Sequence, residues 1–105
     1  MGLTHESSFV YILSNHSNSV IYIGVTTDLI GRLYEHRTQS GGSGFTSRYN
    51  VTKLVYFEEI DGIENAIGRE KQLKGWRREK KDALILSINP DYKDLSDFAY
   101  KYYSR

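Results

Sequence analysis

Two short runs of β-branched and aromatic residues stand out in the hydrophobic pattern near the start of the chain. They cover residues 9–14 and 20–25, and the polar segment between them consists only of Ser, Asn and His. Strand-forming runs bounded by such a polar segment are typical of two antiparallel strands joined by a turn. We therefore expect a β-hairpin over these residues.

A helical pattern follows the hairpin at residues 28–38, and the glycine-rich segment 40–44 comes directly after it. Thr26 or Thr27 is the expected N-cap, because a hydroxyl can accept a hydrogen bond from the free N–H groups of a first helical turn. Glycine and serine then end the helix in a loop.

The second half of the chain predicts one strand and three helices. The strand covers residues 51–59, and the helices cover 63–78, 79–87 after a break near Gly75, and 94–103. The resulting order, β-β-α-β-α-α-α, predicts an α/β fold in which a small three-stranded sheet, opening with an antiparallel hairpin, is flanked by helices.

Composition limits the class of protein. A chain of 105 residues forms one domain, and the absence of cysteine excludes disulfides and thiolate metal sites. No apolar run reaches the ~20 residues that span a bilayer, and no signal-peptide pattern is present, so we expect a cytoplasmic location and no membrane partner. The net charge of +1 is small for a nucleic-acid-binding protein, so the distribution of charge matters more than its sum.

Tyr11 and Tyr22 bring a phenol to each strand of the expected hairpin. A phenol with a pKa near ~10 acts as a base only when a neighbouring cation or hydrogen-bond acceptor assists it. With nine tyrosines in the chain, packing within the sheet is the alternative role for both.

Arg32 and His36 are four residues apart on the expected first helix and therefore share one face. Arginine offers a planar fork of donors suited to phosphate oxygens, and histidine accepts protons near neutral pH. An exposed helix face without chemistry is the alternative interpretation of this pair.

These residues fall into one motif. The spacing is Tyr22-Ile23-Gly24-x-Thr26-x-x-Leu29-x-x-Arg32-x-x-x-His36, preceded by Phe9-Val10-Tyr11. The chain thereby resembles the GIY-YIG endonucleases, specifically the small standalone members related to the nuclease domain of excinuclease C, although Phe9-Val10 stands where the family usually has Gly-Ile. The resemblance runs from Phe9 to about Leu95 and implies the family architecture. It also implies that one phenol deprotonates the attacking water while the other hydrogen-bonds the water or the phosphate, and either tyrosine can take either role.

Glu70 gives an independent indication. It falls on a predicted apolar stripe of one helix, made of Ile63, Ala66, Ile67 and Leu73. A carboxylate among apolar residues needs a compensating cation, which is either a divalent metal or an arginine such as Arg32. A single carboxylate suits Mg²⁺ or Mn²⁺, and the family resemblance implies that Glu70 is the metal ligand. A buried salt bridge without chemistry is the alternative.

Two weaker matches to the family lie outside this core. Asn89 matches an asparagine that several members place beside the scissile phosphate, but Asn89-Pro90 is also a common turn dipeptide. The segment 45–49 resembles the standalone members and either lines a substrate groove or anchors Phe45 in the core.

Residues 69–81 contain seven basic and two acidic side chains. If the helix continues through Gly75, four of the basic residues form one stripe for DNA phosphates: Lys74, Arg77, Arg78 and Lys81. A solvated helix face is the alternative. From the acidic residues at 91, 94 and 97, we expect any DNA affinity to be modest and salt-dependent.

The working hypothesis is a metal-dependent DNA endonuclease that cuts largely without sequence preference and acts with a targeting protein partner. In this hypothesis Tyr11 or Tyr22 activates water together with His36, and Arg32 stabilises the transition state. Arg32 and the metal are expected to lower the pKa of the phenol that acts as base. The alternative is a catalytically idle nucleic-acid-binding or adaptor module that keeps the same fold.

Overall fold

The computed structural model describes residues 6–38 and 48–103. In these ranges the chain forms a three-stranded antiparallel sheet with the order β2-β1-β3. The strands are β1 (Ser7–Ser14), β2 (Ile21–Thr26) and β3 (Lys53–Asp61). The predicted hairpin and three-stranded sheet are therefore confirmed, and β1 lies in the centre.

The composition of β1 explains its central position. Every residue of β1 after Ser7 is buried. Phe9, Tyr11 and Leu13 point to one face of the sheet, whereas Val10 and Ile12 point to the other. A strand covered on both faces needs an uninterrupted apolar run, and residues 9–13 supply one.

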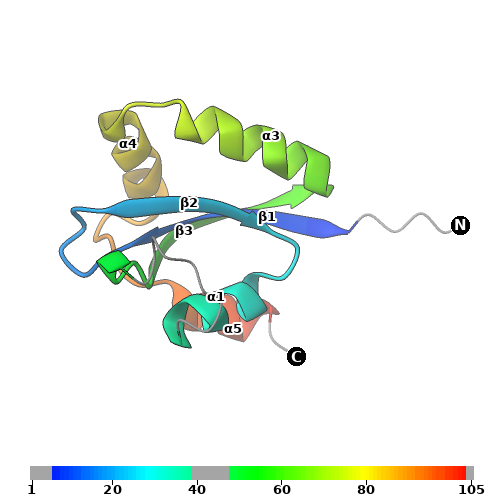
Figure 1. Ribbon diagram of the computed structural model, residues 1–105, viewed down its shortest axis with the longest axis horizontal. Helices are drawn as coiled ribbons and strands as arrows, with labels where there is room; N and C mark the ends of the chain where they lie inside the picture. Colours follow the sequence, from blue (N-terminus) through cyan, green and yellow to red (C-terminus); the bar gives the residue numbers. More distant parts are fainter. Residues whose placement is uncertain (1–5, 39–47, 104–105) are drawn as a thin grey trace, which may run out of the picture.

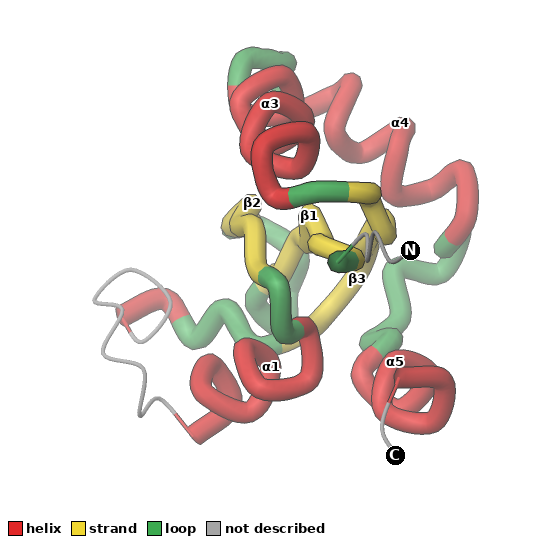
Figure 2. The backbone as a smooth tube through the Cα atoms, turned by 90° about the vertical axis from the view of Figure 1, so that its right-hand side faces the viewer, coloured by secondary structure: helices red, strands yellow, loops and turns green. Residues whose placement is uncertain are grey.

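Helices cover both faces of the sheet. α1 (Leu29–Thr38) and α5 (Ser96–Tyr103) lie on the face of Tyr11, and α3 (Ile63–Lys74) and α4 (Arg78–Ile88) lie on the opposite face (Figures 1 and 2). Each face has its own apolar cluster, so burial of β1 links two cores. None of the helices among the described residues is long and apolar enough to span a membrane.

The start of α1 differs from the prediction. Asp28 is the residue that caps the helix, since its Oδ1 accepts a hydrogen bond of 3.0 Å from the N–H of Gly31. The hydroxyl of Thr26 instead accepts a bond of 2.9 Å from the N–H of Asp28 and so shapes the turn before the helix. The predicted cap at Thr26 or Thr27 is therefore wrong by one or two residues.

The predicted break near Gly75 is confirmed, and it is wider than expected. α3 ends at Lys74, the extended backbone of Arg77 (φ −70°, ψ 159°) precedes α4, and α4 begins at Arg78. Trp76 lies in this break between two cations, with the guanidinium of Arg69 at 5.5 Å and the ammonium of Lys80 at 4.3 Å from its ring centre. The indole therefore helps to fix the angle between the two helices.

The segment between α4 and α5 closes part of the outer edge of β3. The N–H of Leu95 donates to the carbonyl of Leu54 at 2.6 Å, and Asp94 Oδ1 accepts from the N–H of Leu54 at 3.2 Å. The same Oδ1 accepts from the N–H of Ser96 at 2.9 Å. Because Asp94 is used in this way, α5 begins at Ser96, two residues later than predicted.

Candidate active site

The hairpin brings the two phenols of the motif to one face of the sheet. Tyr11 on β1 is paired with Gly24 on β2, and Tyr22 is paired with Leu13, the next β1 residue on the same face. The centres of the two phenol rings lie 6.3 Å apart. The expectation that both phenols lie on neighbouring strands therefore agrees with the structure.

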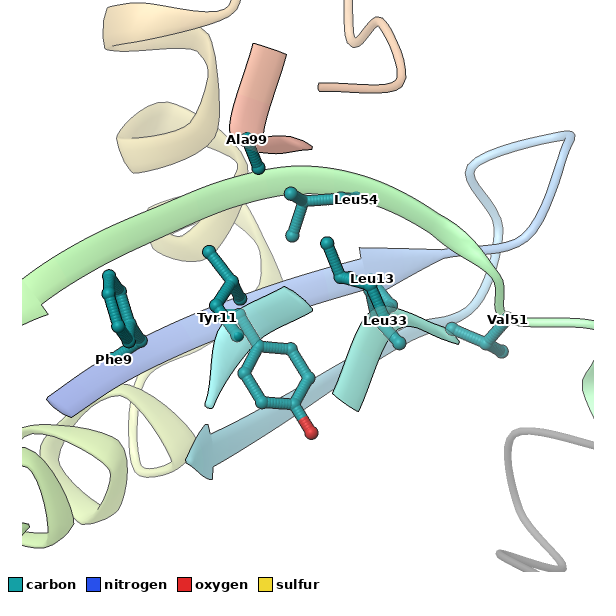
Figure 3. Packing of buried hydrophobic residues seen from close by; sticks show 8 residues of the cluster. Phe9, Tyr11, Leu13, Leu33, Val51, Leu54 and Ala99 are labelled. Atoms are coloured by element: carbon teal, nitrogen blue, oxygen red, sulfur yellow. The ribbon is translucent and has the colours of Figure 1, made fainter. Parts of the chain in front are cut away.

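Gly24 makes room for the ring of Tyr11. A β-carbon built on Gly24 would lie 2.5 Å from Cζ of Tyr11, which is a severe overlap. The phenol of Tyr11 can therefore extend across β2 only because residue 24 has no side chain. Figure 3 shows this ring reaching away from the other labelled core residues, with the hydroxyl at its far end. Gly24, a glycine of the motif, thus sets the position of Tyr11 on the neighbouring strand.

His36 comes to the same place from α1. Its side chain is buried, with 6% of the residue exposed, and Nε2 lies 3.1 Å from the hydroxyl of Tyr11. The ring centre of His36 is 5.8 Å from that of Tyr11 and 5.6 Å from that of Tyr22. Two phenols and one imidazole therefore form a compact group.

Arg32 lies one helical turn before His36 at the exposed side of this group. Its side chain is 42% exposed, and Nη1 is 3.5 Å from Oε1 of Glu35. This separation is too long for a strong hydrogen bond. The guanidinium is therefore loosely held and keeps donors for another anion.

Burial controls the protonation of Tyr11. Removal from water, followed by the nearby phenol of Tyr22, raises the pKa of Tyr11 well above its ordinary value of 10.0, and the opposing effect of Arg32 is smaller. Arg32 does lower this pKa, as expected, but burial and Tyr22 raise it by more, so Arg32 alone does not bring the pKa of Tyr11 below its ordinary value. Near neutral pH its hydroxyl stays protonated and acts as a hydrogen-bond donor.

His36 shifts in the opposite sense for the same physical reason. Burial, and next the positive charge of Arg32, lower the pKa of His36 below its ordinary value of 6.5. The imidazole is consequently neutral at pH 7, and one of its two ring nitrogens can accept a proton. When Nε2 is that acceptor, the hydroxyl of Tyr11 donates to it and Nδ1 carries the hydrogen.

Glu70 approaches from α3, on the other face of the sheet, and its charge still contributes to raising the pKa of Tyr11. The carboxylate is 16% exposed, and Oε2 lies 3.1 Å from the ammonium of Lys74, one turn later on the same helix. The side-chain cation that compensates Glu70 in the structure is therefore Lys74, and the alternative of an arginine such as Arg32 is wrong.

The helix around Glu70 is less buried than its pattern predicts. Ala66 and Leu73 face the core, whereas Ile63 and Ile67 are exposed. α3 packs on a narrow sheet and hides only those of its residues that lie directly above the strands. Glu70 therefore lies at the margin of the core, where a cation can reach its carboxylate.

The comparisons with known proteins agree with this fold. A family model described as the GIY-YIG catalytic domain matches residues 7–82. The chain belongs to the GIY-YIG family. The domain is therefore of the GIY-YIG nuclease type, and the resemblance found in the sequence is confirmed.

Relatives of similar length to this GIY-YIG chain occur in several organisms. The chain is 34% identical over 86 residues to a UPF0213 protein of Syntrophus aciditrophicus, which covers 82% of this chain and 97% of that protein. It is 37% identical over 80 residues to a UPF0213 protein of Haloquadratum walsbyi, which covers 76% and 88% of the two chains. The solution NMR structure of a UPF0213 protein from Bacillus halodurans has 27% identity and a TM-score of 0.54, covering 89% of this chain and 97% of that one.

The residues at the GIY-YIG site fit a metal held by one carboxylate. Among the described residues, no three His, Asp or Glu side chains gather into a cluster that could hold an ion. Glu70 is partly open, and its cation partner Lys74 is a side chain with 53% exposure that can move away. Mg²⁺ commonly binds through one or two carboxylates together with waters and substrate phosphates, so Glu70 alone suits it.

The structure does not bring Asn89 to this group. It is buried at the end of α4, against the outer edge of β3. Its Nδ2 donates to the carbonyls of Val55 and Lys93 at 3.0 and 2.9 Å, and its Oδ1 accepts from the N–H of Lys93 at 3.0 Å. These bonds use the side-chain amide to hold the turn after α4.

The predicted basic stripe is also wrong as a single helical face, because the helix breaks before Arg77. Arg78 has a structural role: its guanidinium contacts Asp82 at 2.9 Å and donates to the carbonyls of Ser19, at 3.0 Å, and of Asn18 in the hairpin turn. Arg77 is exposed and Lys81 is half-buried. The Asp four residues after Arg78 was the sequence signal for this pairing.

Lys74 contacts Glu70 in the structure, whereas the sequence pattern assigned it to a basic stripe for DNA phosphates. Its spacing of four residues from Glu70 was a usable signal, because oppositely charged side chains at that spacing meet on a helix.

Of the segment 45–49, residues 45–47 lie outside the described part, and the guanidinium of Arg48 lies 5.6 Å from the ring centre of Tyr49.

Proposed function

We propose that this protein is a metal-dependent endonuclease that hydrolyses phosphodiester bonds in DNA. The observation that carries the proposal is the contact of 3.1 Å between the hydroxyl of Tyr11 and Nε2 of His36. Tyr22 adjoins this pair, and its ring is 5.6 Å from that of His36. Membership of a nuclease-type family and a hydrogen-bonded acid–base pair at the family motif together support hydrolysis by activated water.

The proton of the attacking water leaves through the phenol–imidazole pair. Because Tyr11 is protonated near neutral pH, it takes the proton from water only as its own hydroxyl proton passes to Nε2 of neutral His36. One O–H bond of water breaks, the hydroxyl of Tyr11 is restored, and His36 becomes the cation. Tyr22 hydrogen-bonds the water or the phosphate beside this path.

Arg32 acts on the phosphate. Its loosely held guanidinium leaves Glu35 and donates to the non-bridging oxygens, whose negative charge grows during attack. A planar fork matches two phosphate oxygens better than an ammonium does.

Glu70 would hold the metal, Mg²⁺ or Mn²⁺, which when bound supplies positive charge that polarises the phosphate and assists the leaving oxygen. The carboxylate is fixed for this purpose by α3, which packs on the sheet through Ala66 and Leu73. Exposed Arg77 and half-buried Lys81 add charge for the DNA backbone, without base recognition. Because a net charge of only +1 gives weak attraction to DNA, the proposal includes a targeting protein partner. The proposed site of action is the cytoplasm.

A nicking assay on supercoiled plasmid tests this function. We expect relaxation of the plasmid in Mg²⁺ or Mn²⁺ and none in EDTA. Glu70→Gln should lower the rate by about 10³-fold or more, since metal-ion charge stabilisation contributes several kcal/mol. Glu64→Gln, an exposed carboxylate in the first turn of the same helix, is the matched control and should cut at the normal rate.

Absence of nicking in both metals, by protein shown to be folded, would overturn the endonuclease assignment and leave a binding or adaptor module. Equal rates for Glu70→Gln and Glu64→Gln would instead overturn only the assignment of the metal to Glu70.

A further inference from the structure

The pair formed by Glu70 and Lys74 has a feature that the proposed chemistry does not use. The carboxylate is 16% exposed, whereas the side chain of its partner is 53% exposed, and the two are joined by a single contact of 3.1 Å. The mostly buried member is the anion that the metal needs. The more exposed member is a cation of the kind that a DNA phosphate needs.

We propose that Lys74 holds the Glu70 carboxylate until a divalent metal replaces it, and that the released ammonium then binds a DNA phosphate. This inference rests on the proposed function, because it takes Glu70 as the metal ligand. Its consequence is that the metal and DNA each raise the affinity of the protein for the other.

The exchange is physically favourable because the two cations differ in charge and in attachment. An ammonium brings one positive charge on a flexible four-carbon chain, and a divalent ion brings two charges to the same oxygens. Once the ion is bound, Lys74 is repelled from it, and the exposed stem lets the ammonium swing away at little cost.

The neighbouring basic residues cannot take this role. Arg69 on the same helix is held by Glu58, with contacts of 2.7 to 3.2 Å, and donates to Gln72 at 2.8 Å. Lys71 is exposed and has no side-chain partner in the part of the chain that the structure describes. Lys74 is therefore the cation that changes partner when Glu70 does.

Linkage makes the coupling reciprocal. If the metal frees an ammonium that then contacts DNA, the factor by which the metal raises DNA affinity equals the factor by which DNA raises metal affinity. If Lys74 contacts DNA both with and without the metal, or stays on Glu70 both with and without the metal, it contributes no such coupling.

The first arm of the test measures Mn²⁺ binding to the protein alone, by electron paramagnetic resonance of the free ion. Lys74→Gln should raise Mn²⁺ affinity by about threefold to tenfold, since a competing charge at contact distance is removed. Lys74→Arg should lower it, because a guanidinium fork grips the carboxylate more firmly. Lys71→Gln, which changes the net charge equally, should have a much smaller effect.

The second arm measures binding of a short fluorescent duplex by anisotropy, with and without Mn²⁺, in a Tyr11→Phe, Tyr22→Phe background that suppresses cleavage. Mn²⁺ should raise DNA affinity severalfold when Lys74 is present. In the Lys74→Gln variant this enhancement should shrink to the part that comes from the contact of the metal itself with a DNA phosphate, and in the Lys71→Gln variant it should persist in full.

The outcomes separate the two proposals. Mn²⁺ binding that Glu70→Gln abolishes but Lys74→Gln leaves unchanged would overturn the exchange and keep Glu70 as the ligand. Mn²⁺ binding that Glu70→Gln does not affect would overturn the exchange and the assignment of the metal to Glu70, whereas the nicking assay decides separately whether the protein is an endonuclease. An enhancement of DNA binding by Mn²⁺ that is equal with and without Lys74 would overturn the coupling, even if Lys74 competes with the metal.

Discussion

Tyr11 and Tyr56 are two buried phenols on adjacent strands that face opposite sides of the sheet. Burial is the largest influence on both, and it raises the pKa of each above its ordinary value of 10.0. By these measures the two tyrosines are alike. Burial and a raised pKa therefore do not distinguish a candidate catalytic phenol from a structural one.

Their partners distinguish them. The hydroxyl of Tyr56 donates to Glu58, whose carboxylate also accepts from Nε and Nη2 of Arg69. In this group the phenol of Tyr56 and the guanidinium of Arg69 both donate to the carboxylate of Glu58 and offset its charge. Tyr11 instead contacts a neutral imidazole, and the nearby cation, Arg32, is only loosely paired at 3.5 Å. The site on the α1 face retains hydrogen-bonding capacity for a substrate, and the network on the α3 face does not.

The largest expected difference between the two faces is in catalysis. Tyr11→Phe should lower the rate of plasmid nicking by about 10²- to 10⁴-fold, the range for loss of a proton-transfer group. Tyr56→Phe should leave the rate within about twofold after correction for the folded fraction. Similar rates for the two variants would show that the comparison does not mark the active site, and would point to Tyr22 and His36 alone as the groups that activate water.

Arginine gives the next largest contrast. Arg32→Lys should reduce the cleavage rate by about 10²-fold, since an ammonium does not replace two-point contact with the phosphate. DNA affinity, measured by anisotropy, should fall much less than the rate. Arg69→Lys should leave the rate nearly unchanged. A proportional loss of rate and affinity in Arg32→Lys would place this residue in binding instead of catalysis.

The free energy of unfolding should depend more on Arg69 than on Arg32, the reverse of the order for catalysis. The side chains of Arg69 and Glu58 are only 26% and 21% exposed, so Arg69→Met leaves a partly buried carboxylate without its cation. We expect a loss of about 2 kcal/mol in the free energy of unfolding, below the figure for a fully buried pair. Arg32→Met, on a half-exposed side chain, should change it by no more than about 0.5 kcal/mol. Urea denaturation of both variants measures the difference.

The smallest effect is on the pH dependence of stability, where the two faces should lose stability in different ranges. Burial, with Arg32, lowers the pKa of His36 below 6.5, so the unfolded chain takes up this proton first as the pH falls. The contribution of neutral His36 is therefore complete above pH 6.5 and lost as the pH falls below it.

Glu58 loses its contribution at lower pH. Burial alone would raise its pKa, but the hydrogen bonds from Arg69 and Tyr56 outweigh burial and keep the pKa below 4.5. This contribution is present above pH 4.5 and lost below it. His36→Gln should flatten only the upper part of the stability curve and Glu58→Gln only the lower part, by about 1 kcal/mol or less each. A single shared range would mean that the faces do not titrate independently.

Local pattern in the sequence determined the elements and the family. The apolar run of residues 9–13 predicted a strand, the polar segment after it predicted a turn, and Gly75 predicted a break between helices. The spacing from Tyr22 to His36 identified the motif. These features depend on neighbours within a few residues, where the period of a helix or a strand fixes which side chains share a face.

Tertiary structure decided which groups meet and how they are charged. Lys74 instead of Arg32 compensates Glu70, Asn89 holds a turn, and Arg78 binds the hairpin turn 59 and 60 positions away. The sequence pattern placed Arg32 beside a phenol and suggested a lowered pKa, but packing buried Tyr11 and raised it. The physical reason is that desolvation and long-range pairing depend on the distance to every other part of the chain, which the spacing of residues within one helix or strand does not contain.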